Sequence, residues 1–65
     1  MNEVKVLAHA AKLIIETRVD QEGFLASGRV ADYAEYRHVC GVIRGLNTAE
    51  QIIKDLVQRL EKDDE

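Results

Sequence analysis

The fold is decided at residues 27–35, which read SGRVADYAE and separate two long stretches with helical spacing. Ser27 and Gly28 form a stop signal, because a glycine just past the last helical turn adopts the left-handed conformation that satisfies the final carbonyls. Asp32 and Glu35 then match a capping box, in which Asp32 accepts from an unpaired backbone amide and Glu35 reaches back. This stretch therefore predicts a tight turn between two helices.

Apolar residues recur every three or four positions on both sides of this turn, which is the periodicity of one helical face. The spacing predicts a first helix over about residues 2–26, a turn over 27–32, a second helix over about 33–61 and an acidic tail over 61–65. Gly23 is the one position that favours an early end to the first helix. Because the turn is short, the helices should fold back on each other. The predicted fold class is all-α, a single antiparallel two-helix hairpin.

The apolar stripe of the second helix is wider than one partner helix can cover. Its edges should stay exposed in a monomer, and they comprise Val42, Ala49, Ile52 and Leu56. An exposed apolar strip of that length is typical of an interface. A chain of 65 residues also rarely buries a sufficient core alone. We therefore expect the hairpin to complete a bundle by oligomerisation or by docking on a partner.

The composition argues against several classes of function. The chain has 9 Lys and Arg against 12 Asp and Glu, and its net charge of −3 argues against direct nucleic-acid binding. No apolar stretch approaches the roughly 20 residues needed to cross a membrane. The single cysteine, Cys40, excludes an internal disulfide and fits a reducing compartment. Because there is no phosphate-binding glycine loop and no Ser/His/Asp set, we predict no enzymatic activity and no cofactor.

Gly41, Gly45 and Ala49 are spaced four residues apart on the second helix, which creates a groove that admits another backbone. Two glycines inside a helix cost roughly 2 kcal/mol and so need a reason. One interpretation is close packing against the first helix through Ala8 and Ala11. The alternative is a contact with another molecule.

Glu35 and His38 form a Glu-x-x-His pair, the motif that ferritin-like bundles present to a di-iron centre. With Glu22 roughly level with Glu35 in the hairpin, dimerisation would assemble a di-metal four-helix bundle from these residues. The competing interpretation gives Glu35 a capping role and leaves His38 on the surface. We predict no metal site and keep the di-metal bundle as an alternative.

Two segments carry a resemblance. Residues 28–37, GRVADYAEYR, and residues 40–46, CGVIRGL, resemble short helical-hairpin proteins of tailed bacteriophages that are encoded among head and packaging genes. The resemblance implies a structural or assembly protein of the virion, such as a minor capsid, decoration, connector or internal component. It implies a location in the virion or the host cytoplasm.

The expected partners are further copies of the chain, a larger phage structural protein, or both. Contacts are expected at Tyr33, Tyr36 and Arg37 and along Gly41, Gly45, Ala49, Ile52 and Leu56. A small phage-encoded inhibitor that presents its acidic tail to a host protein is a further alternative.

Overall fold

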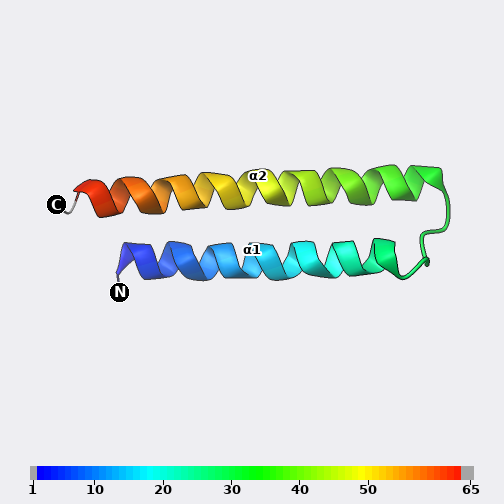
Figure 1. Ribbon diagram of the computed structural model, residues 1–65, viewed down its shortest axis with the longest axis horizontal. Helices are drawn as coiled ribbons and strands as arrows, with labels where there is room; N and C mark the ends of the chain where they lie inside the picture. The colour runs from blue at the N-terminus through cyan, green and yellow to red at the C-terminus, as the bar shows by residue number, and fades with distance from the viewer. Residues whose placement is uncertain (1, 64–65) are drawn as a thin grey trace.

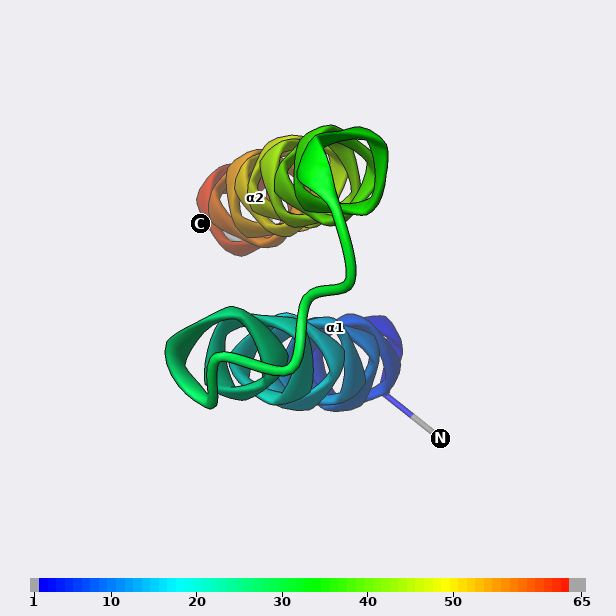
Figure 2. The same ribbon diagram turned by 90° about the vertical axis from the view of Figure 1, so that its right-hand side faces the viewer.

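The computed structural model describes residues 2–63, with side chains described through residue 62, and these residues form two helices and no strand. Helix α1 spans Glu3–Ala26 and helix α2 spans Tyr33–Asp63. The helices run antiparallel over the length of α1, joined by one turn, and the longer α2 projects beyond α1 (Figure 1). Seen end-on they form a single two-helix layer, 50 × 16 × 14 Å in extent (Figure 2). The predicted all-α hairpin is confirmed.

Helix α1 is closed at both ends by the residues that flank it. At its start, Asn2 Oδ1 accepts a 2.8 Å hydrogen bond from the Val4 amide. At its end, the Ser27 amide donates to the Gly23 carbonyl over 3.0 Å and the Gly28 amide donates to the Leu25 carbonyl over 3.3 Å. Gly28 has a φ of 77°, the left-handed conformation expected of a C-terminal glycine. The helix passes through Gly23 without a break.

Helix α2 begins with a reciprocal cap. Asp32 Oδ1 accepts from the Glu35 amide over 2.8 Å, and Glu35 Oε1 accepts from the Ala31 amide over 3.0 Å. The Glu35 side chain thus reaches one residue further back than in the standard capping box, where it would meet the amide of Asp32. The helix ends at Asp63, two residues beyond the predicted end. Part of the predicted acidic tail is therefore helical, and its residues 64–65 lie outside the described residues.

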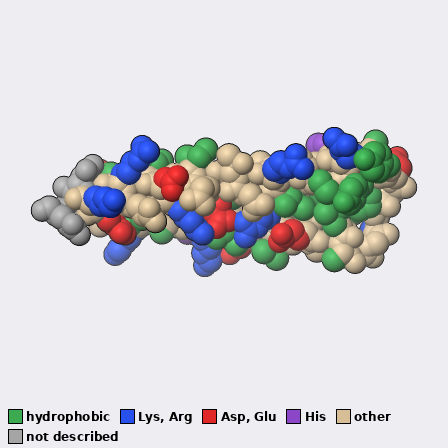
Figure 3. All heavy atoms as spheres, turned by 45° about the horizontal axis from the view of Figure 1, so that its top comes forward, with side chains coloured by type: hydrophobic (Ala, Val, Ile, Leu, Met, Phe, Trp, Pro, Cys, Tyr) green, Lys and Arg blue, Asp and Glu red, His purple; other side chains and the backbone are tan. Residues whose placement is uncertain are grey.

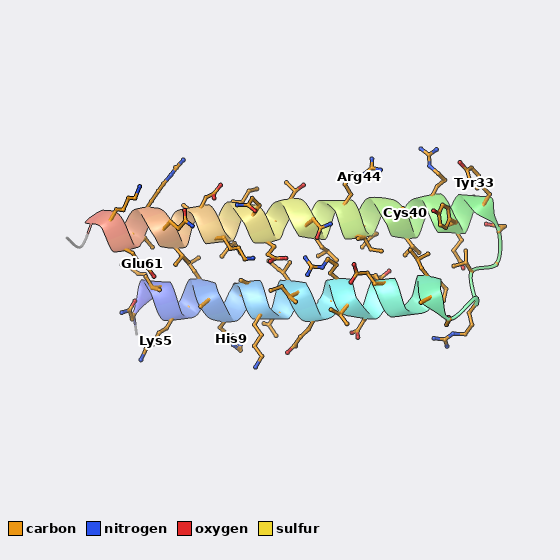
Figure 4. The ribbon with its side chains drawn as sticks, in the orientation of Figure 1. Lys5, His9, Tyr33, Cys40, Arg44 and Glu61 are labelled. Atoms are coloured by element: carbon orange, nitrogen blue, oxygen red, sulfur yellow. The ribbon has the colours of Figure 1, made fainter. Side chains whose placement is uncertain are left out.

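Each helix contacts the other along one row of residues, which we call the seam. All seam residues are buried or half-buried. Their spacing alternates between three and four, as in a seven-residue coiled-coil repeat. The seam comprises Val4, Leu7, Ala11, Ile14, Arg18, Gln21 and Leu25 on α1, and Val39, Ile43, Leu46, Glu50, Ile53, Val57 and Leu60 on α2. Lys5, His9 and Arg44 point away from the opposite helix (Figure 4). Among the described residues Val39, 5% exposed, is the only apolar side chain that counts as buried, and none is fully buried.

A polar layer interrupts this seam near its middle. Arg18 Nη1 donates to Asn47 Oδ1 over 2.7 Å and pairs with Glu50. Lys54 Nζ lies 2.6 Å from the other carboxylate oxygen of Glu50. Glu50 is only 9% exposed. Its negative charge is compensated by two cations, Arg18 and Lys54. The hydrogen bonds from Lys54 and Arg18 hold the pKa of Glu50 below its ordinary value of 4.5.

The turn can be tested with the same substitution at two glycines. Gly28→Ala should lower the free energy of unfolding by about 1–2 kcal/mol, because an L-residue is strained in the left-handed conformation. Gly23→Ala should raise it by roughly 0.8–1 kcal/mol, since alanine is the better helix former and the added Cβ meets nothing of the described chain within 4 Å. Urea unfolding followed by circular dichroism measures both. Changes of the same sign would contradict this assignment of the turn.

The polar layer predicts a specific acid sensitivity. Because the pKa of Glu50 is lowered in the folded chain, its stabilising contribution is complete above its ordinary pKa and disappears as the pH falls through the lower, folded pKa. The free energy of unfolding should therefore decrease below about pH 4.5, and Glu50→Gln should flatten that decrease. Urea unfolding at a series of pH values measures the profile. Glu16→Gln, at an exposed position of α1, should keep the wild-type profile, and an equal profile in both variants would contradict the role of Glu50.

Candidate interaction surfaces

The apolar side chains of α2 that lie beside the seam remain exposed. Ile52 is 56% exposed and Leu56 is 41% exposed, while Val42 and Ala49 are half-buried. Each of these residues comes one position before a seam residue, which rotates it by about 100° around the helix axis. The predicted exposure of the stripe edges is thus confirmed for Ile52 and Leu56 but not for Val42 and Ala49.

The helix glycines do not pack against α1. A Cβ added at Gly41 or Gly45 would meet no heavy atom of the described chain within 4 Å, apart from its own helix backbone. The interpretation that these glycines pack on α1 through Ala8 and Ala11 is therefore wrong. Ala8 and Ala11 instead line a shallow groove together with Ile53 and Val57 of α2. Because the glycines face open space, the alternative that remains is a contact with another molecule.

Helix α1 carries a second exposed apolar row, which the sequence analysis did not identify. Val6 is 47% exposed and Leu13 is 49% exposed, and both come one position before a seam residue of α1. The signal was present in the sequence, since the row repeats the spacing of the seam shifted by one residue.

The two exposed rows lie on the same side of the hairpin. Residues one position after the seam, namely Ala8, Lys12 and Ile15 of α1 and Lys54 and Gln58 of α2, line one common groove. The residues one position before the seam, on α1 and on α2, must then share the opposite side of the hairpin. Val6 is one of these residues, and it lines a groove on that side with Leu60. We call this side the open face, and it comprises Val6, Ala10, Leu13, Val42, Gly45, Ala49, Ile52 and Leu56.

A second apolar surface lies at the turn end of α2. The rings of Tyr33 and Tyr36 stack with centroids 6.1 Å apart and planes inclined by 26°. Tyr33 is 69% exposed, and its hydroxyl oxygen accepts a 3.5 Å hydrogen bond from Arg37 Nη1. Apolar side chains gather at this end of the molecule (Figure 3). We call Tyr33, Tyr36 and Arg37 the turn-end patch; these three predicted contact residues do lie together.

Two neighbours of this patch complete the description of the turn end. Hydrogen bonding with the Cys40 thiol raises the pKa of Tyr36 above its ordinary value of 10.0, so the phenol is neutral at physiological pH. Phe24 is covered instead by the Arg29 guanidinium, 5.7 Å from the ring centroid. The patch consists of two stacked tyrosine rings and one guanidinium group.

The single hairpin does not assemble the residues of the di-metal alternative. Glu35 caps α2 through Ala31, and Glu22 lies 4.0 Å from Arg18 Nε. His38 is exposed on α2. Within the described part of the chain, no three His, Cys, Asp or Glu side chains are grouped so that they could hold a metal ion. Glu22, Glu35 and His38 thus belong to separate local arrangements.

Comparison with protein-family models, with curated proteins and with solved structures finds no match for this chain. Neither helix, over its described length, is long and apolar enough to cross a membrane. The open face and the turn-end patch are the features of the described chain that bear on its function.

Proposed function

We propose that the chain is a non-enzymatic assembly protein of a tailed-phage particle and acts through helix–helix packing. The observation that carries this proposal is the incomplete core, since Val39 is the only buried apolar side chain among the described residues and none is fully buried. A small domain with so little burial is stabilised mainly by what it contacts. The chain then acts by binding neighbouring proteins.

The arrangement of the two surfaces supports this role. The open face extends along the side of both helices, whereas the turn-end patch lies at the first turns of α2. A chain with two separate apolar surfaces can bind two neighbours at once, as an assembly component must. Tyrosine and arginine are also the residue types that contribute most to binding energy at protein interfaces.

The resemblance to short tailed-phage proteins supports a role in a phage particle. Its two segments, residues 28–37 and 40–46, occupy the turn and the first part of α2, which includes the turn-end patch. We assign the patch to a larger phage structural protein and propose a minor capsid, decoration, connector or internal position. The chain would then be found in the virion and, before assembly, in the host cytoplasm.

The proposal predicts the protein content of the particle. In particles produced from a phage genome that encodes this chain, quantitative mass spectrometry should detect it at a fixed number of copies. Replacing both aromatic rings, Tyr33→Ala with Tyr36→Ala, should reduce that number at least tenfold, because both rings are lost from the proposed contact.

Arg44→Ala serves as the control, since Arg44 is exposed on α2 and points away from α1 (Figure 4). This variant should be incorporated like the wild type. Absence of the wild-type chain from both the particle and its assembly intermediates would overturn the proposed function. Equal incorporation of the double tyrosine variant would overturn the assignment of the turn-end patch.

A further inference from the structure

The single chain exposes more surface than a folded monomer of its mass. Its accessible surface is 5083 Å², whereas a compact monomer of 7.3 kDa is expected to expose about 4,200 Å². The difference, about 900 Å², is close to the roughly 800 Å² that each partner contributes to a standard stable interface. The excess therefore has the size of one missing protein neighbour.

The open face has the chemistry of an interface core. Its centre is formed by Ala10, Leu13, Ala49, Ile52 and Leu56, which are uncharged, and one charged residue, Asp20, follows on the α1 row level with Gly45. The opposite side of the hairpin carries Lys12 and Lys54 at the corresponding positions, one residue after the seam. Interface cores are depleted of charged residues. Of the two sides, the open face is the one suited to burial.

The register of the hairpin indicates which surface complements the open face. Within one chain, Val6 lies beside Leu60 and Arg18 reaches Asn47, so facing residues have numbers that add to about 66. A two-fold axis parallel to the helices would place a second copy's α1 over α2 in this same antiparallel register. In that register Leu56 of one copy faces Ala10 of the other and Leu13 faces Ile52, so apolar side chains meet across the two-fold axis.

We propose that the open face is closed by a second copy of this chain, forming a two-fold symmetric four-helix bundle in which all neighbouring helices are antiparallel. Gly45 is the position at which the second copy's α1 approaches the backbone of α2. This explains why a glycine with no neighbour within 4 Å in the single chain occupies the middle of a helix. The inference rests on the proposed assembly function and names one of its partners.

The experiment compares one substitution at two glycines. Gly45→Leu fills the open face, whereas Gly23→Leu makes the same change on α1 outside that face. In both positions an added Cβ meets no heavy atom of the described chain within 4 Å, so both variants should keep the hairpin. Sedimentation velocity over a concentration series measures the mass, and circular dichroism checks that helix content is retained.

The wild type and Gly23→Leu should both sediment at twice the 7.3 kDa chain mass. Gly45→Leu should remain helical and show a dimer dissociation constant at least tenfold higher. A wild-type monomer at every concentration, an assembly other than a dimer, or equal association of the two leucine variants would overturn the inference.

The failure of this inference is distinguishable from the failure of the proposed function. A monomeric chain that is still found in phage particles would overturn the dimer and leave the assembly function standing. A dimer that is sensitive to Gly45→Leu but absent from particles would support the interface and overturn the phage role.

Discussion

Two helices lying side by side can remove from water only the strip along which they touch, and this constraint governs the rest of the structure. Each helix has a full circumference of side chains, and one neighbour covers only one side of it. The burial of apolar surface is the main force that stabilises a fold. A hairpin whose helices carry apolar rows on two sides can bury only the row that faces its other helix, and the second row stays exposed to water. The exposed positions of Leu13 and Ile52 follow directly from this geometry.

Within the covered strip, the polar layer contributes less to stability than to register. A buried ion pair gains little net free energy, because removing its charges from water offsets their attraction. If α2 slid by one seven-residue repeat, however, Arg18 would face Ile43 or Val57 instead of Glu50. The guanidinium would then lose its carboxylate partner, and Glu50 would be left among apolar side chains. Such polar positions specify register in coiled coils.

The sequence predicts most of the local structure because local structure depends on neighbouring residues. Gly28, Asp32 and Glu35 act within a few residues of themselves, and the turn lies where they indicate. The orientation of Gly41 and Gly45 was harder to predict because α2 carries apolar residues on two adjacent rows. Spacing alone does not tell which row faces α1. That choice depends on the relative rotation of the two helices, which no single helix encodes.

The same limit applies to contacts between the helices. Glu50 interrupts an apolar repeat, and nothing within α2 indicates that Arg18, 32 positions earlier, would be its partner. The di-metal alternative likewise depended on placing Glu22 level with Glu35, a relation between helices. Long-range register was therefore the part of the candidate site that remained undetermined by sequence.

The left-handed backbone at Gly28 has a consequence for the architecture as a whole. Leu25 and Val39, the seam residues on either side of the turn, are 14 positions apart, which is two complete coiled-coil repeats. Continued with the same steps of three and four, however, the α1 seam would pass through positions 42, 49 and 56, whereas the α2 seam passes through 43, 50 and 57. A chain that stayed helical through this region would therefore carry a stripe that shifts sideways between its two halves. By ending α1, the left-handed Gly28 lets each half turn its own seam toward the other.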